Sequence, residues 1–269
     1  MSEPFDYSGR TVFVAGGTSG INLAVARAFA RAGAAVAVLS RSPGKVRAAV
    51  EGLRALGGPA EGFEADVRDF DAVATAVAAA RERLGEFDVL ISGAAGNFPA
   101  AAADMSARAF AAVVDIDLKG TYNVLRASYE HLRKPGAAVV NISAPQSTVP
   151  MELQVHACAA KAGVDMVTRV CALEWGPAGV RVNAVVPGPI AGTEGMARLA
   201  PTPELEQVVT GSVPLGRYGD VQEIADCCLW LASPLAAYVT GAVVPVDGGW
   251  SLGGASQVFS DMRRLFTGP

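Results

Sequence analysis

Three glycines between residues 16 and 20 form the strongest chemical signal in the sequence. They follow the apolar run Val12 to Val14, and after Gly20 the apolar residues recur at helical spacing. A glycine turn from a strand into a helix lets backbone N–H groups approach an anion, which the positive end of the helix dipole also stabilises. The turn therefore predicts a phosphate-binding site, with a turn that holds no ligand as the alternative.

The residues after the second expected strand, 35–39, indicate which nicotinamide cofactor this turn would hold. An acidic side chain there accepts hydrogen bonds from the adenosine ribose, whereas an arginine accommodates a 2′-phosphate. The sequence is Ser40-Arg41-Ser42, with a cation between two hydroxyls and no acid. We therefore expect NADP(H); the alternative is a solvated surface arginine.

Strand-like and helix-like stretches alternate along the whole chain and must position these residues. Strands are expected at 12–14, 35–39, 62–65, 89–91, 138–142, 180–186 and 242–246, and helices from 21 and at 43–56, 69–84, 110–132, 153–175 and 221–231. Residues 191–216 are expected to be irregular and to cover the substrate. This alternation predicts an α/β fold: a single doubly wound Rossmann-type domain over 1–269, with about seven parallel strands and helices on both faces.

Composition excludes several classes of function. Apolar residues make up 51% of the chain and the net charge is −4, which describes a globular protein without a basic surface for nucleic acid. No apolar run is long enough to span a membrane, no secretory signal opens the chain and no peroxisomal tripeptide closes it, so we expect a cytoplasmic protein. The four cysteines lack metal or disulfide spacing and the two histidines are too few for a metal cluster, so no metal is expected.

The glycine spacing resembles that of the short-chain dehydrogenase/reductase family, whose turn follows T-G-x-x-x-G-x-G. Ala15 stands at the threonine of that pattern and Asn22 at its last glycine. The family works with Asn, Ser, Tyr and Lys, the last two four residues apart on one helix. Lys161 matches the lysine, but Ala157 stands at the tyrosine. His156 is no simple substitute, because its side chain is turned roughly 140° away from that of Lys161.

The remaining motifs resemble the tyrosine-less, peroxisomal-type 2,4-dienoyl-CoA reductases within this family, from about Arg10 to Gly249. They lie at Gly93 to Phe98, Asp115 to Asp117, Leu153 to Lys161, Glu174 to Pro177, Pro187 to Gly195 and Ser233 to Ala242. Gly93 departs from the group, which has cysteine there. The resemblance implies hydride transfer from NADPH to the δ-carbon of an unsaturated acyl-CoA thioester, followed by protonation at the α-carbon. A carbonyl reduction must protonate an alkoxide, whereas a dienolate needs only hydrogen-bond donors and a held water.

The resemblance also implies roles for individual residues. It assigns catalysis to Asp117, Ser143 and Lys161, and substrate contacts to Asn97, Phe98 and Ser143. It assigns cofactor contacts to Gly16, Thr18, Ser19, Gly20, Ile21, Arg41, Asp66, Val67, Ala94, Lys161, Pro187, Gly188, Ile190 and Thr193. A homotetramer is expected. Three alternatives stay open: an NADP(H)-dependent oxidoreductase acting on a carbonyl or alcohol, a non-catalytic NADP(H)-binding protein, and an Asp117–Lys161 pair that is only a buried ion pair.

Overall fold

The centre of the computed structural model, which describes residues 5–200 and 202–253, is one sheet of seven parallel strands. The strands lie in the order β3-β2-β1-β4-β5-β6-β7, so the winding reverses between β1 and β4. The predicted α/β fold is thus confirmed. Ligands of such sheets bind beyond the carboxyl ends of the strands at that reversal. The strands are β1 (Thr11–Ala15), β2 (Ala35–Ser40), β3 (Ala60–Glu64), β4 (Val89–Ser92), β5 (Ala138–Ile142), β6 (Arg181–Pro187) and β7 (Val243–Val246).

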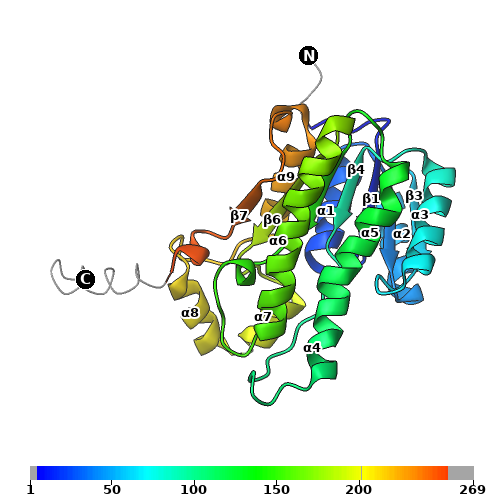
Figure 1. The fold of residues 1–269 in the computed structure, drawn as a ribbon. Coiled ribbons are helices and arrows are strands. Elements are labelled where there is room, and N and C mark those ends of the chain that lie inside the picture. Colours follow the sequence, from blue (N-terminus) through cyan, green and yellow to red (C-terminus); the bar gives the residue numbers. More distant parts are fainter. Residues whose placement is uncertain (1–4, 201, 254–269) are drawn as a thin grey trace.

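Helices cover both faces of the sheet (Figure 1). One face is covered by α1 (Gly20–Arg31), α2 (Pro43–Arg54) and α9 (Val221–Ala232), and the other by α3 (Phe70–Leu84), α5 (Gly120–Ser128) and α6 (Val155–Trp175). The alternation along β1 shows why both faces are needed. Val12 and Val14 pack toward α1 and α9, while Phe13 and Ala15 pack on the opposite face. An uninterrupted apolar strand therefore has both of its faces buried.

The helix expected over 110–132 is wrong in one functionally important respect. The chain forms α4 (Ala107–Val114), then a π-helical turn over Asp115–Lys119, then α5, which ends at Ser128. A single π turn inside helical sequence leaves the apolar spacing nearly unchanged, so the pattern did not predict it. Such turns are frequent at functional sites, and this one contains Asp117.

The irregular segment expected over 191–216 is also wrong, because it contains α7 (Glu194–Leu199) and α8 (Pro203–Ser212). The Thr and Pro residues that suggested a loop act instead as helix starts. Thr193 and Thr202 are the N-caps, with side chains that accept from Met196 N and Leu205 N. Smaller differences concern β3, which begins at Ala60, and α6, which begins at Val155.

Candidate functional site

Two adjoining cavities lie at the carboxyl ends of the strands, and every residue singled out from the sequence as a site residue lines one of them. The arginine cavity, named for Arg41, has a volume of about 450 Å³, and the lysine cavity, named for Lys161, about 520 Å³. The arginine cavity contains Gly16, Thr18, Ser19, Arg41, Asp66, Val67 and Ala94. The lysine cavity contains Gly20, Ile21, Asn97, Phe98, Asp117, Ser143, Lys161, Pro187, Gly188, Ile190 and Thr193.

The glycine turn lies between the two cavities and contributes residues to both. Gly16 has a φ of 78°, and a Cβ there would lie 2.9 Å from the Cα and N of Ala94. The side chain of Ser19, the N-cap of α1, makes no hydrogen bond to the helix. The first N–H groups of α1 have no partner within the helix, so they can hold an anion. The turn thus fits the phosphates of a dinucleotide.

Positive charge gathers where β2 meets α2. The Arg41 side chain is 60% exposed and lies 3.8 Å from the carboxylate of Asp66. Lys45, which sequence reasoning missed, also lines the arginine cavity from the first turn of α2. Ser42, the N-cap of α2, makes no side-chain hydrogen bond to its helix. Two cations and an open helix start make this a favourable place for an anionic group.

Asp66 is held by a neighbour that the sequence motifs did not point to. Its carboxylate accepts hydrogen bonds from Arg68, the shortest at 2.6 Å. These bonds lower the pKa of Asp66, although burial acts to raise it. The carboxylate therefore stays ionised at the edge of the arginine cavity, where it accepts from Arg68 and lies 3.8 Å from Arg41.

Two of the departures from the family pattern, Asn22 and Gly93, lie in contact and account for one another. The Asn22 amide donates from Nδ2 to the carbonyl oxygen of Gly93 at 2.7 Å. A Cβ at position 93 would collide with Oδ1 of Asn22. The side chain at position 22 therefore fills the space that a side chain at position 93 would need. It also joins the start of α1 to the segment after β4, and both residues border both cavities.

A buried ion pair forms the charged centre of the lysine cavity. The Asp117 carboxylate lies 3.3 Å from Nζ of Lys161, and the two side chains are only 3% and 9% exposed. Asp117 also accepts from the backbone N–H of Gly96 at 2.8 Å, and Lys161 donates to the carbonyl of Ile142 at 3.1 Å. Ala157 lies beside them, one helical turn before Lys161. No tyrosine is among the described residues that line this cavity.

Ser143 lies at the end of β5, and its partner was missed by sequence reasoning. Its hydroxyl donates to Oδ1 of Asp165 at 2.5 Å. Asp165 is 2% exposed and lies on α6, four residues after Lys161. The spacing of Lys161 and Asp165 on one helix face was available in the sequence, but an acid in the middle of a helix is usually solvated.

Amide side chains form another wall of the lysine cavity. Oε1 of Gln154 accepts from Nδ2 of Asn97 at 2.9 Å and from Nε2 of Gln146 at 2.8 Å. Phe98 packs edge-on against His156, with ring centroids 4.6 Å apart. His156 is fully buried behind Phe98 and is not among the residues that line the cavity. It therefore lies off the face that carries Lys161, as its position in the helix predicts.

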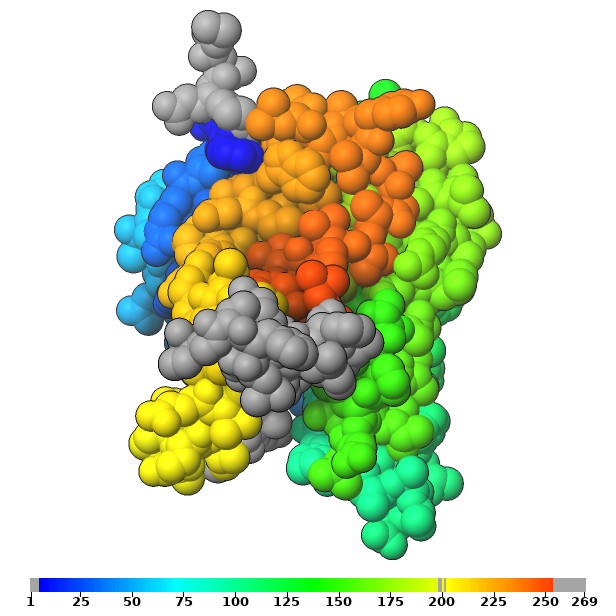
Figure 2. All heavy atoms as spheres, turned by 90° about the vertical axis from the view of Figure 1, so that its left-hand side faces the viewer, coloured from blue at the N-terminus to red at the C-terminus, as the bar shows by residue number. Residues whose placement is uncertain are grey.

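The start of α7 borders both cavities. Thr193 and Met196 line the lysine cavity, and Glu194 lines both cavities. Figure 2 shows α8 projecting below the body of the molecule. Trp250, which also lines the lysine cavity, donates from Nε1 to Ser212 Oγ at the end of α8. The start of α7 thus lies at the lysine cavity, and the end of α8 contacts Trp250, one of the residues that line it.

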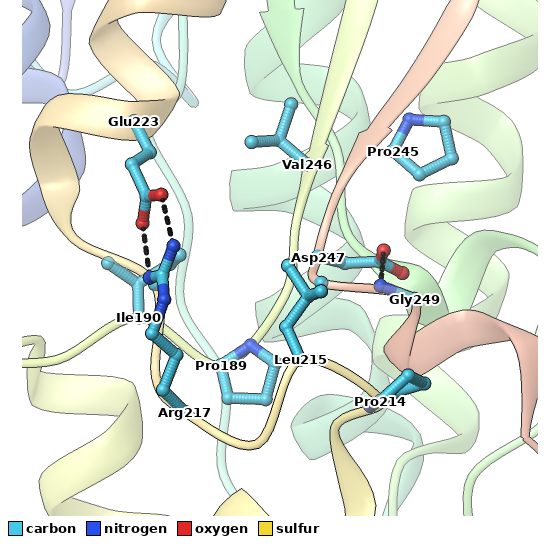
Figure 3. Close-up of a pocket in the computed structure, with 12 residues that line it drawn as sticks. Pro189, Ile190, Pro214, Leu215, Arg217, Glu223, Pro245, Val246, Asp247 and Gly249 are labelled. Atoms are coloured by element: carbon cyan, nitrogen blue, oxygen red, sulfur yellow. Dashed lines mark hydrogen bonds and ion pairs between the residues drawn. The ribbon is translucent and has the colours of Figure 1, made fainter.

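A third cavity of about 510 Å³ lies between β6, β7 and the segment after α8 (Figure 3). The charged side chains among its described lining residues are engaged with neighbours. Arg217 pairs with Glu223 through two hydrogen bonds, and Asp247 accepts from the backbone N–H groups of Gly249 and Ser251. This cavity offers little for catalysis.

Within residues 5–200 and 202–253, no group of His, Cys, Asp or Glu side chains is placed to hold a metal ion. In the same part of the chain, no helix has the length and apolar character needed to cross a membrane. The four cysteines are free thiols, and burial raises the pKa of Cys171 and of Cys227 to about 11.

Proteins of one known family match this chain over most of its length. The family described as "Enoyl-(Acyl carrier protein) reductase" matches residues 15–251. The chain belongs to the short-chain dehydrogenase/reductase family. It is 46% identical over 243 residues to a protein of Pongo abelii named peroxisomal 2,4-dienoyl-CoA reductase [(3E)-enoyl-CoA-producing], covering 89% of this chain and 83% of the relative. A protein of Arabidopsis thaliana with the same name is 38% identical over 262 residues, covering 93% and 88%.

Solved structures of short-chain dehydrogenases have the same fold. The gluconate 5-dehydrogenase of Burkholderia cenocepacia, in complex with NADP and tartrate, matches with a TM-score of 0.87 and 26% identity. The match covers 94% of this chain and all of that one. The resemblance to the short-chain family inferred from the motifs is therefore confirmed. Members of this family use a nicotinamide cofactor, for which the open start of α1 and the close approach at Gly16 provide a fitting cradle.

Proposed function

We propose that this protein is an NADPH-dependent reductase of 2,4-dienoyl-CoA thioesters that uses Asp117 and Lys161 in place of a catalytic tyrosine. The observation that supports this most is the buried ion pair of these two residues in the same cavity as Ala157. The names of its relatives support the same substrate class. The protein is accordingly an oxidoreductase.

The cations around the arginine cavity favour NADPH over NADH. Arg41 and Lys45 would bind the 2′-phosphate, with Ser40 and Ser42 as neutral neighbours. The N–H groups at the start of α1 would bind the pyrophosphate. The amide of Asn22 keeps the segment after β4 close to α1, which shapes the passage between the two cavities.

The residues of the lysine cavity fit the reduction of a conjugated thioester. Bound NADPH supplies a hydride, which reduces the δ-carbon of the dienoyl group. The negative charge spreads to the thioester oxygen, so hydrogen-bond donors stabilise it and no alkoxide has to be protonated. The Lys161 ammonium has three N–H donors; the Ile142 carbonyl takes one and the Asp117 carboxylate another. The third is left for a ligand in the cavity.

Asp117 and Lys161 together hold the water that protonates the substrate. The Lys161 ammonium, held in place by Asp117, donates its third N–H to this water, and one water proton is directed to the α-carbon. Lys161 returns a proton to the hydroxide that is left and regains one from solvent. The product is a 3-enoyl thioester, the product that the names of the Pongo abelii and Arabidopsis thaliana relatives state.

The substrate lies along the wall formed by Asn97, Phe98 and Gln154, in a single domain over residues 1–269. Residues 191–216, with α7 and α8, cover it. Phe98 is 37% exposed, which suits contact with an acyl chain. The carboxamides of Asn97 and Gln154 suit the polar thioester end.

The assembly that fits this proposal is a cytoplasmic homotetramer. On α6, Met166, Val170 and Leu173 form an apolar stripe at helical spacing, and Leu173 is 79% exposed. A helix face of this kind is normally covered by a partner. Light scattering at micromolar concentration tests the assembly, and a monomer mass would contradict it.

Oxidation of NADPH by a 2,4-dienoyl-CoA tests the proposed activity. We expect turnover with the dienoyl-CoA and none with simple ketones, and Lys161→Met should abolish it without weakening NADPH binding more than a few-fold. Turnover of ketones but not of dienoyl-CoA would support a carbonyl reductase instead. Fluorescence-detected binding of NADPH without any turnover would support a non-catalytic binding protein.

A further inference from the structure

Asp165 is a buried carboxylate next to a residue of the lysine cavity, and none of the roles proposed above involves it. It is 2% exposed and lies one helical turn beyond Lys161 on α6. Oδ1 accepts from the Ser143 hydroxyl at 2.5 Å, and Oδ2 has no hydrogen-bond partner in the described part of the chain. A buried carboxylate destabilises a fold unless it is well paired.

Asp88 shows what a structural buried carboxylate looks like in the same fold. It is 6% exposed at the opposite end of the sheet, where it accepts from Arg10, Arg133 and the backbone N–H of Thr11. Asp165, in contrast, is bonded to one site hydroxyl. One hydrogen bond within the described residues is poor pairing for a buried carboxylate. The donor of that bond, Ser143, lines the lysine cavity.

This bond decides what Ser143 can do. A hydroxyl has one proton and two lone pairs, and the proton of Ser143 is given to Asp165. Only lone pairs are then left for the lysine cavity, which Ser143 lines. Ser143 can accept a hydrogen bond there, but it cannot donate one to a thioester oxygen.

We propose that Asp165 is a positioning residue that fixes Ser143 as a hydrogen-bond acceptor in the reaction cavity. The effect of Asp165 on catalysis rests on the proposed function. With Ser143 accepting, a water in the cavity donates one proton toward Ser143 Oγ, and its second proton is directed away from the end of β5. Asp165 thereby helps to orient the water that Asp117 and Lys161 hold, so that the second proton of this water faces the α-carbon.

A double-mutant cycle of Asp165→Asn and Ser143→Ala tests this. Asparagine has the shape of aspartate, but its Nδ2 can donate to Ser143 and so reverse the hydroxyl. We expect each single variant to lower kcat about tenfold or more, as misplaced catalytic groups do, with KM changed less. The double variant should be no slower than Ser143→Ala alone, and NADPH affinity should stay within about twofold. Asp88→Asn is the matched control: it should lower the melting temperature and leave kcat unchanged.

The proposal is overturned if Asp165→Asn slows turnover equally with and without Ser143, or if it leaves kcat at the wild-type value. A readout independent of turnover is the carboxyl-carbon NMR resonance of Asp165, identified by its loss in Asp165→Asn. Ser143→Ala should shift that resonance, because the hydrogen bond is lost, and an unmoved resonance would contradict the proposal even if Asp165→Asn failed to fold. If the wild type does not reduce dienoyl-CoA but the resonance moves, the proposed function fails while the Asp165–Ser143 bond stands.

Discussion

Asp117→Asn separates the electrostatic role of the buried pair from its shape. Asparagine can still accept from the Gly96 N–H but removes the charge that faces Lys161. Two unit charges 3.3 Å apart attract by roughly 5 kcal/mol at an effective dielectric constant of about 20. Both side chains are almost fully buried, and breaking such a pair by removing one partner typically costs about 3–5 kcal/mol. We expect a stability loss near the lower end of that range, because the carboxamide keeps one hydrogen bond.

Urea unfolding and steady-state kinetics on the same variants measure both effects. Asp117→Asn should also lower turnover about 100-fold, as the loss of an acid–base positioning group does. Asp117→Asn combined with Lys161→Met should recover much of the stability, since no unpaired charge remains, but none of the activity. A double variant no more stable than either single variant would show that the charges are not coupled. Turnover close to wild type in Asp117→Asn would refute the catalytic role.

Further predictions concern cofactor choice, the position of the missing tyrosine, the contact between Asn22 and Gly93, and stability in acid. Arg41→Ala should weaken NADPH binding by roughly 1–3 kcal/mol in a fluorescence titration and leave NADH nearly unchanged. Ala157→Tyr should not raise dienoyl-CoA turnover, because the phenol would fill the place of the held water. Gly93→Ala should lower stability to urea by about 1 kcal/mol by displacing the Asn22 amide, and Asn22→Gly in the same chain should restore it. Burial alone would raise the pKa of Asp88, but hydrogen bonds from arginine and backbone N–H outweigh it and lower the pKa. The stabilisation that results is fully present above the unfolded-state pKa of Asp, and it is lost as the pH falls through the lower folded-state pKa. Asp88→Asn should abolish this dependence of stability on pH.

Four outcomes would contradict these predictions. Equal losses for NADPH and NADH in Arg41→Ala would mean that Arg41 does not contact the 2′-phosphate. Faster dienoyl-CoA reduction by Ala157→Tyr would mean that no water occupies that place. Additive losses in Gly93→Ala and Asn22→Gly would show that the two residues do not share one space. Acid unfolding unchanged by Asp88→Asn would assign that transition to other carboxylates.

The parallel sheet with helices on both faces follows from features that the sequence shows directly. Apolar strands buried on both faces, such as Val12 to Val14, alternate with amphipathic helices, and that alternation determines a parallel sheet. Many of the candidate site residues directly follow strands, at the carboxyl ends where the cavities lie, whereas Asp117 and Lys161 lie on helices and came from the family resemblance. Lys45 could have been found as well, since it lies in the first turn of the helix after Arg41.

The features that the sequence did not predict depend on the local backbone or on contacts between distant segments. The π-helical turn at Asp117 leaves no clear change in apolar spacing. Thr193 and Thr202 look like loop residues until their side chains are seen to cap α7 and α8. Two hydrogen bonds join residues that are far apart in the chain: Asn22 to Gly93, and Ser143 to Asp165. Only the fold brings them together.

The position of the transferred atoms in the product tests the central claim most directly. The protein is supplied with NADPH deuterated at the transferred hydrogen, and in a second reaction with unlabelled NADPH in D₂O, each with a 2,4-dienoyl-CoA. We expect deuterium from the cofactor at the δ-carbon, deuterium from solvent at the α-carbon, and a 3-enoyl-CoA as the product. Cofactor deuterium on a carbonyl carbon, or a 2-enoyl product with solvent deuterium at the γ-carbon, would contradict the proton path through the water held by Asp117 and Lys161.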